Sequence, residues 1–363
     1  MAEFSQQEYL RYSRHIQLPG VGIDGQLKLK SARVLIVGCG GLGAPVSLYL
    51  AAAGLGNITL IDADSVELSN LQRQITFSEK DIGKNKALCT QERLQQLNSD
   101  IQVDAIDHAL SVDNAEALIQ SADLVLDCTD NFPTRYLIND LCKINDTPWI
   151  YASVYQQSGQ CALFTPQESC FRCLFPSPPK DELDCNAAGV LGVLPGLLGT
   201  LQATEALKYL ADIPCSSVNT LLLVETSDMH FQKITLQKNS NCILCSDDNP
   251  VFDPSNNDYK LHCSAAEKSI SSISAADFEQ WSQRDDIILI DIREQHERDA
   301  FNLGGEHIPA DQLLSSIAGK VENKTALLYC QSGVRSQKAC ELLLGKNIKA
   351  LSVAGGITEI IRQ

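Results

Sequence analysis

Short apolar segments rich in β-branched residues alternate with segments of helical pattern along the first part of the chain. Buried strands are predicted at residues 33–37, 57–62, 101–106, 123–129 and 149–154. Helices are predicted between them at residues 42–53, 84–97, 113–120 and 132–144. Regular alternation of strand and helix is typical of a parallel, doubly wound sheet, so we predict an α/β fold for this region.

Two polar segments interrupt the alternation. Residues 176–184 are Pro-rich and charged, which predicts a loop, and an apolar helix is expected after it at 190–210. Residues 246–257 are rich in Asp, Asn, Ser and Pro, which is the composition of a linker.

The alternating pattern restarts after this polar segment. Helices are expected at residues 274–281 and 336–344, and strands at residues 287–291 and 325–329. We therefore predict a first domain over residues 1–245, a linker over 246–264, and a smaller α/β domain over 265–363.

Length and charge narrow the class of protein. The 363 residues fit two domains of ordinary size. A formal net charge of -16 argues against a protein that binds nucleic acid by neutralising phosphates. No segment has the pattern of a secretory leader or the roughly 20 apolar residues of a membrane span, so we expect a cytoplasmic protein without a membrane partner. Fourteen cysteines in such a protein are expected to be metal ligands, reactive thiols or core residues rather than disulfides.

A glycine-rich turn from Gly38 to Gly43 (GCGGLG) follows the first predicted strand and opens the next helix. Glycines at these positions let the backbone approach a phosphate, which then lies at the positive end of the helix. Asp62 ends the next predicted strand and is placed to accept hydrogen bonds from ribose hydroxyls. Together these features predict a Rossmann-like nucleotide site.

The turn alone does not decide between NAD and ATP. Candidate nucleotide-binding residues follow it at Ser69, Asn70, Leu71, Gln72, Arg73, Lys86, Asp130 and Asn131. Transfer of a phosphoryl or adenylyl group needs cations on the phosphate oxygens and a carboxylate for Mg²⁺, and Arg73, Lys86 and Asp130 supply that set. The cluster favours ATP with Mg²⁺, and an NAD-dependent oxidoreductase remains the alternative.

Five segments carry a family resemblance. In chain order they are RYSRHIQLPGVG, VGCGGLGAPVSLYLAAAGLG, LIDADSVELSNLQRQ, GKNKA and DCTDN, and they resemble the MoeB/ThiF family over nearly all of residues 1–245. These relatives of the ubiquitin-activating enzymes adenylate the C-terminal glycine of ubiquitin-like sulfur carrier proteins.

The resemblance also implies roles for particular residues. ATP would be contacted by Gly41, Asp62, Asn70, Arg73 and Lys86. Asp130 would hold Mg²⁺ and be essential for adenylation. Arg14 would reach into the ATP site of a partner subunit, which implies a homodimer.

Two C-x₂-C pairs, Cys170 with Cys173 and Cys242 with Cys245, have the spacing of metal ligands. Four thiolates satisfy a tetrahedral Zn²⁺ site, and the long gap is acceptable if the site clips the end of a domain to its middle. The alternatives are two unrelated pairs or a redox motif. The family resemblance implies a structural site.

Cys185 follows the predicted loop at 176–184 and precedes a helix. A cysteine near the positive end of a helix can have a lowered pKa, because its thiolate is favoured there. Cys185 is therefore either an ordinary loop residue or a nucleophile. In the family, a cysteine at this position can link covalently to the activated carrier.

A second reactive cysteine is predicted at Cys330, in the segment CQSGVRS between a strand and a helix. Backbone N–H groups of such a loop, the helix N-terminus and Arg335 would favour a thiolate or a persulfide anion. This loop, with residues 290–294, 305–309 and 354–357, resembles a rhodanese domain over about residues 265–363.

Together these features predict a fused adenylyltransferase and sulfurtransferase. The carrier's C-terminal glycine would be adenylated, and a persulfide on Cys330, loaded by a cysteine desulfurase or another donor, would convert it to a thiocarboxylate. The alternative is an activating enzyme that conjugates the carrier to proteins and uses the rhodanese domain for docking. Molybdenum cofactor, thiamine, tRNA thiolation and small metabolites all remain open as the pathway.

Overall fold

The computed structural model describes residues 4–177, 189–215, 217–246, 252–254, 259, 272–317, 319–321 and 324–362. These residues form two compact units, one within residues 4–259 and one within residues 272–362. Among the described residues, no helix combines the length and the hydropathy needed to cross a bilayer.

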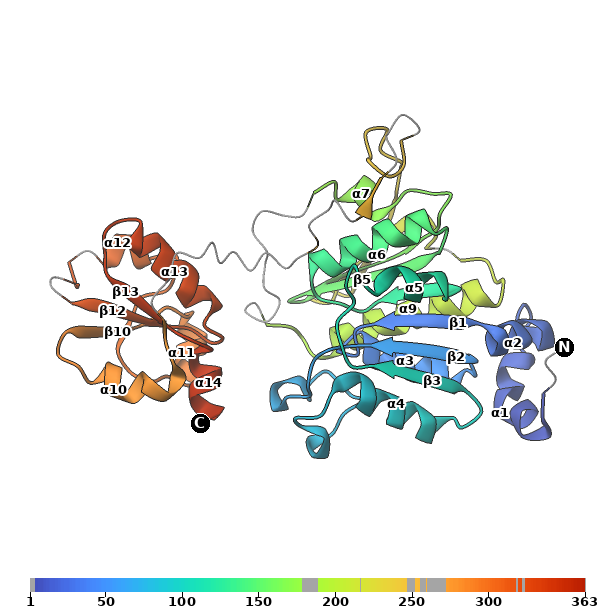
Figure 1. Cartoon of the computed structure of the whole chain (residues 1–363), viewed down its shortest axis with the longest axis horizontal. Helices are drawn as coiled ribbons and strands as arrows, with labels where there is room; N and C mark the ends of the chain where they lie inside the picture. The colour runs from blue at the N-terminus through green and yellow to red at the C-terminus, as the bar shows by residue number, and fades with distance from the viewer. Residues whose placement is uncertain are drawn as a thin grey trace. The chain divides into compact units, whose positions relative to one another are not determined.

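The larger unit is built on an eight-stranded sheet with the strand order β3-β2-β1-β4-β5-β6-β7-β8 (Figure 1). The strands are β1 (Arg33–Val37), β2 (Asn57–Ile61), β3 (Gln102–Ile106), β4 (Leu124–Asp127), β5 (Trp149–Tyr155), β6 (Ser158–Phe164), β7 (Thr220–Glu225) and β8 (His230–Thr235). β1 to β5 are parallel, and β6 to β8 continue the sheet in antiparallel pairs. Val37 at the end of β1 is in register with Ile61 and Asp127, so β1, β2 and β4 end at one edge of the sheet.

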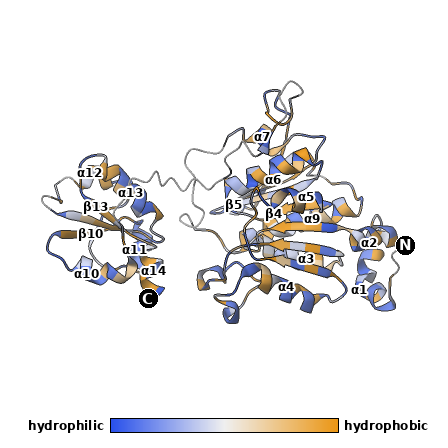
Figure 2. Ribbon diagram, in the orientation of Figure 1, coloured by the Kyte–Doolittle hydropathy of each residue, from blue (hydrophilic) through white to orange (hydrophobic). Residues whose placement is uncertain are grey.

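Helices cover both faces of this sheet. They are α1 (Gln6–Ile16), α2 (Gly22–Ser31), α3 (Gly43–Ala52), α4 (Lys86–Leu97), α5 (Ala115–Gln120), α6 (Phe132–Ile144), α7 (Phe171–Leu174) and α9 (Val193–Leu210), with 3-10 turns η1 (Leu68–Asn70) and η2 (Glu79–Asp81). Val34 and Ile36 of β1 pack with α3, α4 and α9, whereas Leu35 and Val37 pack with α5 and α6. Figure 2 shows the resulting apolar strands at the centre of the unit.

The predicted doubly wound α/β arrangement is confirmed for β1 to β5, but the antiparallel half of the sheet was missed. β5 and β6 pair from Tyr155 and Ser158, so Gln156 and Gln157 form the turn, and Gln156 has a φ of 53°. A Gln-Gln turn lacks the Asn-Gly or Gly signal that identifies a hairpin. β8 is exposed along its whole length, so it lacks the alternation of buried and exposed positions that a half-buried strand carries.

The smaller unit has a five-stranded parallel sheet with the order β11-β10-β12-β13-β9. Its strands are β9 (Ser272–Ile273), β10 (Ile287–Asp291), β11 (Glu306–His307), β12 (Thr325–Tyr329) and β13 (Ala350–Val353). Its helices are α10 (Phe278–Ser282), α11 (Gln295–Ala300), α12 (Leu313–Ser316), α13 (Val334–Leu344) and α14 (Gly356–Arg362). The helix predicted at 274–281 is divided, because a 3-10 turn, η4 (Ala275–Asp277), precedes α10.

Part of the segment predicted to be a linker lies against the larger unit. The Tyr259 hydroxyl donates a hydrogen bond to Asp140 Oδ2 at 2.6 Å. The ring of Phe252 lies 5.7 Å from the Arg172 guanidinium. Tyr259 therefore contacts α6, and Phe252 contacts α7.

Candidate functional site

The turn from Gly38 to Gly43 joins β1 to α3 and accepts only glycine at two positions. Gly38 has a φ of 94°, and a Cβ there would lie 2.7 Å from the Cys128 carbonyl oxygen. A Cβ on Gly43 would lie 2.1 Å from the Gly38 carbonyl oxygen. The turn is tight because β4 passes beside it, and it leads directly into the positive end of α3.

Asp62 lies beside this turn, directly after β2. Its Oδ2 accepts a hydrogen bond from the Cys39 N–H at 2.7 Å, and its Oδ1 accepts one from the Asp64 N–H at 2.8 Å. Burial raises the pKa of Asp62 from its ordinary value. The carboxylate is fixed by the backbone next to the turn, and its predicted contact with ribose remains a prediction.

The segment from Ser69 to Arg73 lies close to the same turn. A Cβ on Gly41 would lie 3.6 Å from Arg73 Cγ and 2.9 Å from Pro195 Cβ on α9. Arg73 Nη1 donates to the Ser69 carbonyl at 3.1 Å, and Asn70 is buried in η1. Arg73 is thus brought to the turn as expected, whereas the contribution of α9 was not foreseen.

Two other residues of the segment differ in their surroundings. The Leu71 side chain is partly buried and packs against the apolar core. Gln72 is exposed, and its carbonyl oxygen would lie 2.6 Å from a Cβ on Gly192. Gly192 therefore allows the start of α9 to pack against this segment.

Lys86 is buried at the start of α4 and has a partner that the sequence analysis missed. Its Nζ forms an ion pair with Asp64 Oδ2 at 2.9 Å. The Lys86 charge also acts on Asp62, where it opposes the effect of burial on the pKa. Lys86, Asp62 and the glycine turn therefore gather at one edge of the sheet.

Asp130 and Asn131 lie in the loop between β4 and α6, at the same edge of the sheet as the turn. Asp130 is exposed. Asn131 Oδ1 accepts a hydrogen bond from the Thr134 N–H at 3.0 Å, so it caps α6. Buried beneath the loop, Arg135 pairs with Asp127 at 2.9 Å, and neither residue was identified from the sequence.

Arg14 is exposed in the last turn of α1. Within the described part of the chain, no hydrogen bond or ion pair joins it to the residues around the turn. Its implied contact is with the site of a second copy, which a single chain does not test.

The four cysteines of the two C-x₂-C pairs come together, which removes the alternative of two unrelated pairs. Cys170 Sγ lies 3.9 Å from Cys173 Sγ and 3.6 Å from Cys242 Sγ, and all four sulfurs, including that of Cys245, are within 4.8 Å of one another. Zn–S bonds of about 2.3 Å in a tetrahedron place sulfurs about 3.8 Å apart, so the cluster fits one such ion. The hydrogen bond between Cys170 and Cys242 lowers the pKa of the Cys242 thiol.

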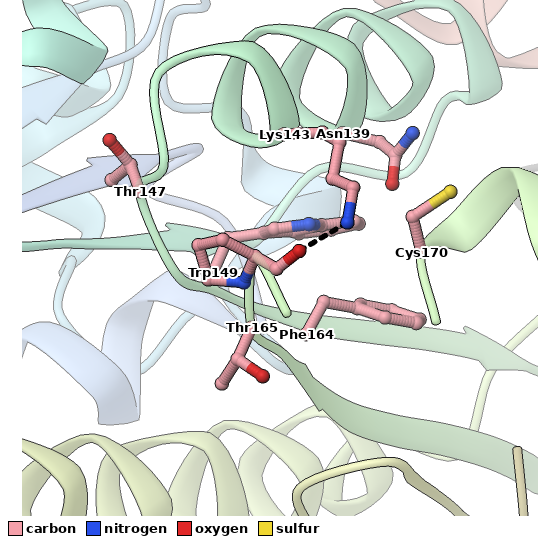
Figure 3. Close-up of a pocket in the computed structure, with 8 residues that line it drawn as sticks. Asn139, Lys143, Thr147, Trp149, Phe164, Thr165 and Cys170 are labelled. Atoms are coloured by element: carbon pink, nitrogen blue, oxygen red, sulfur yellow. Dashed lines mark hydrogen bonds between the residues drawn. The ribbon is translucent and has the colours of Figure 1, made fainter. Parts of the chain in front are cut away.

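A pocket adjoins this cluster on the side of Cys170 (Figure 3). Trp149, Phe164 and Lys143 line it, and the Lys143 ammonium donates to the Pro166 carbonyl inside it. The pocket combines the rings of Trp149 and Phe164 with polar side chains such as those of Asn139 and Thr147. Cys185, the other candidate nucleophile of this domain, lies outside the described residues.

Cys330 begins the loop between β12 and α13 and is fully buried. Its Sγ accepts hydrogen bonds from the N–H groups of Gly333 at 3.2 Å and Ser336 at 3.4 Å. Gly333 has a φ of 86°, and a Cβ on Gly356 would lie 2.4 Å from the Cys330 carbonyl oxygen. The backbone N–H groups converge on the sulfur, an arrangement that stabilises an anion.

Arg335 has a carboxylate partner that the sequence analysis did not identify. Its Nη1 and Nη2 donate to the two oxygens of Glu297 on α11 at 2.8 and 2.6 Å. These hydrogen bonds raise the pKa of Arg335. Much of the Arg335 charge is therefore neutralised, and the backbone N–H groups and the start of α13 supply most of the positive potential at Cys330.

The fold and these two sites agree with comparisons to known proteins. Residues 12–244 match the ThiF family and residues 274–363 match the rhodanese-like domain. The chain therefore belongs to the ThiF family and carries a rhodanese-like domain after the ThiF region.

Its relatives include proteins with the same combination. It is 37% identical to "Adenylyltransferase and sulfurtransferase MOCS3" of Xenopus laevis, over 93% of this chain and 81% of that protein. It is 34% identical to "Probable adenylyltransferase/sulfurtransferase MoeZ" of Mycobacterium tuberculosis (strain CDC 1551 / Oshkosh), over 99% and 94%. A crystal structure of E. coli MccB with ATP has a TM-score of 0.56 and 28% identity, over 67% of this chain and 75% of that one.

Membership of the ThiF family also decides between ATP and NAD as the nucleotide, a choice that the glycine turn alone left open. Adenylyltransferases use ATP, and the match to ThiF extends over the turn, Asp62, Arg73, Lys86 and Asp130. The alternative of an NAD-dependent oxidoreductase is therefore set aside.

Proposed function

We propose that the chain adenylates the C-terminal glycine of a ubiquitin-like sulfur carrier protein and then converts it to a thiocarboxylate with sulfur held on Cys330. The observation that carries this proposal is the presence in one chain of a nucleotide turn flanked by Arg73 and Asp130 and of a cysteine loop whose N–H groups meet at the sulfur. Support also comes from a relative named "Sulfur carrier protein adenylyltransferase", from Thermus thermophilus, which is 43% identical over 68% of this chain and 93% of that protein.

The first step needs a phosphate cradle and charge compensation. The N–H groups of the glycine turn and the positive end of α3 receive the phosphates, and Arg73 and Lys86 offset negative charge on their oxygens. Asp130 would hold Mg²⁺, which neutralises the pyrophosphate as it leaves. The carrier's carboxylate attacks the α-phosphate, forming a C–O–P bond and releasing pyrophosphate.

The second step uses the smaller domain. A donor with a reactive sulfane sulfur, such as a cysteine desulfurase, leaves a persulfide on Cys330. The terminal sulfur of this persulfide attacks the acyl carbon, and AMP leaves with the electron pair of the C–O bond. A second thiol, for which Cys185 is the candidate, then attacks the Cys330 sulfur of the acyl disulfide and releases the thiocarboxylate. Two equivalents of an external thiol then reduce the resulting disulfide and are themselves released as a disulfide.

Several features of the assembly belong to the same proposal. We propose boundaries at residues 1–245, 246–264 and 265–363, a structural Zn²⁺ at the four-cysteine cluster, and a cytoplasmic location. We also propose a homodimer in which Arg14 of one copy enters the ATP site of the other. Exposed Leu10 and Leu18 near Arg14 are the kind of apolar side chains that an interface would cover.

One experiment tests the sequence of reactions. The full chain is mixed with its carrier, ATP, Mg²⁺ and a persulfide donor, and the mass of the carrier's C-terminus is measured. Replacement of one oxygen by sulfur is expected for the wild type. Cys330→Ala should still exchange pyrophosphate into ATP but leave the carrier's carboxylate unchanged.

A second function has one specific observation in its favour. A relative named "SAMP-activating enzyme E1", from Haloferax volcanii, is 42% identical over 65% of this chain and 88% of that protein. If Cys330→Ala forms thiocarboxylate at the wild-type rate, the role of Cys330 is refuted. The alternative function, an activating enzyme that uses its rhodanese domain for docking, is then favoured.

A further inference from the structure

The loop that carries Asp130 is held on both sides. Thr129, directly before Asp130, donates from its N–H and its hydroxyl to Asp127 Oδ1 at 2.9 and 2.6 Å. Asn131, directly after it, caps α6 through Thr134. The exposed Asp130 therefore stands between two residues whose positions are fixed by hydrogen bonds.

A single arginine binds the buried end of this loop. Arg135 is 3% exposed, and its Nε donates to Asp127 Oδ2 at 2.9 Å. Its Nη2 donates to the carbonyls of Thr129 at 3.0 Å and Ala152 at 3.4 Å. One guanidinium thus connects the last residue of β4, the residue before Asp130, and β5.

Aromatic rings surround the same guanidinium and orient it. Its carbon lies 4.8 Å from the centre of the Tyr151 ring and 6.0 Å from that of Phe171. Phe171 follows Cys170 in the four-cysteine cluster, and its N–H donates to Asn139 at 2.8 Å. A lysine in this place would keep the charge but lose the planar fork that makes several hydrogen bonds at once.

We propose that Arg135 is a positioning residue for adenylation, which fixes the backbone before Asp130 so that this carboxylate faces Mg²⁺ and ATP. The inference rests on the proposed function, because it concerns the role of Asp130. Outer residues that orient a metal ligand typically change metal affinity or activity by about 10–100-fold when they are replaced. A loop left to sample several conformations would pay the cost of ordering at each binding event.

The test compares Arg135→Lys with Arg172→Lys in the full chain. Arg172 is a matched control, because it is also buried and pairs with a carboxylate of α6, Asp140, through two hydrogen bonds of 2.6 Å. It also lies against an aromatic ring, that of Tyr136, at 4.6 Å. Within the described residues, Arg172 makes no hydrogen bond or ion pair with the loop that carries Asp130, in contrast to Arg135.

Two quantities are measured besides the melting temperature. Calorimetric titration gives the affinity for an α,β-methylene analogue of ATP with Mg²⁺, and pyrophosphate exchange gives the half-saturating Mg²⁺ concentration. For Arg135→Lys we expect about tenfold weaker analogue binding and a higher Mg²⁺ requirement. For Arg172→Lys we expect the melting temperature to fall about as much as in Arg135→Lys, while the affinity for the ATP analogue stays at the wild-type value.

Two outcomes overturn the inference. One is wild-type affinity and Mg²⁺ dependence in Arg135→Lys; the other is an equal loss of affinity in both variants, which would make the effect one of general stability. If Arg135→Lys does not fold, Thr129→Val provides the test, since it removes one hydrogen bond of the loop and leaves Asp127 paired with Arg135. Thr129→Val should weaken binding of the ATP analogue, as expected for Arg135→Lys, and unchanged binding would contradict the inference.

The experiment also separates this inference from the proposed function. A wild-type chain that neither binds the ATP analogue nor exchanges pyrophosphate with its carrier would refute the proposed function. A wild-type chain that does both, beside an Arg135→Lys variant that matches it, would refute only the role of Arg135.

Discussion

Removing one ligand of the four-cysteine cluster should weaken the larger domain by a large and calculable amount. Cys242→Ser leaves three thiolates, which hold the proposed Zn²⁺ far less tightly than four do, and loss of the ion opens the clip between the end of the domain and its middle. Cys173 and Cys242 enclose about 70 residues, and a cross-link around a loop of this length stabilises a fold by roughly 4 kcal/mol in the chain-entropy treatment of disulfides. A metal bridge closes the same loop, and because its site does not exist in the unfolded chain, the free energy of metal binding also adds to the stability of the fold.

The stability change converts to a measurable shift. A loss of 1 kcal/mol lowers the melting temperature of a domain of this size by roughly 2–4 °C, so a loss of roughly 4 kcal/mol lowers it by roughly 8–16 °C. Differential scanning calorimetry of the full chain measures the shift, and elemental analysis should find about one zinc per wild-type chain. A strong chelator added to the wild type should reproduce the shift.

Cys215→Ser is the control for this variant. Cys215 is outside the cluster, and its thiol donates to the carbonyls of Glu205 and Ile213, which a serine hydroxyl can also do. This variant should keep both its zinc and its melting temperature. A wild-type protein without metal, or a chelator that leaves the melting temperature unchanged, would refute the reasoning.

Three further predictions concern single contacts. Glu297→Gln should lower the melting temperature at neutral pH, because the Glu297 pKa, which burial raises, is on balance depressed by Arg335. The difference should be complete above the unfolded pKa of about 4.3 and should shrink as pH falls from there through the lower folded-state pKa, which a thermal series from pH 7 to pH 3 tests. Tyr259→Phe should cost about 1–3 kcal/mol in urea unfolding, because the hydrogen bond to the buried Asp140 is lost. Gly43→Ala should abolish binding of the ATP analogue in a titration while the rhodanese domain still accepts sulfur, since its Cβ would lie 2.1 Å from the Gly38 carbonyl oxygen.

The sequence predicted what local patterns encode. The helix expected at 132–144 has the observed bounds of α6, and the strands expected at 33–37 and 325–329 are those of β1 and β12. The glycine turn was also predicted correctly, because its pattern of glycines occurs between a strand and a helix. Boundaries were less accurate: Asn85 caps α4, so the helix begins at Lys86 and not at residue 84.

Partners that come from distant segments could not be predicted in the same way. Asp64 pairs with Lys86 from 22 residues away, and Glu297 pairs with Arg335 from 38 residues away. No periodicity or spacing identifies such a carboxylate, since each lies in a short segment with other charged residues nearby. The four cysteines are the exception, because the coordination of zinc itself specifies that two pairs should meet.

The two loops share a backbone arrangement that the proposed function uses for two different anions. Each follows a parallel strand, opens a helix and depends on a glycine with positive φ, Gly38 in one and Gly333 in the other. In the proposed function the first receives phosphates from solution, with Arg73, three residues after η1, and Lys86, the first residue of α4, as the cations that meet them. The second encloses the sulfur of its own Cys330, which is fully buried there.

That burial bears on the choice between sulfur transfer and conjugation. The Cys330 sulfur lies beneath the loop and accepts two N–H hydrogen bonds, so it is poorly placed to attack a carrier's acyl group directly. A persulfide adds a terminal sulfur at an S–S bond length of about 2.05 Å from the buried Cys330 sulfur. The geometry therefore favours the outer sulfur as the atom that meets the acyl-adenylate, which yields a thiocarboxylate and leaves the cysteine sulfur with the enzyme.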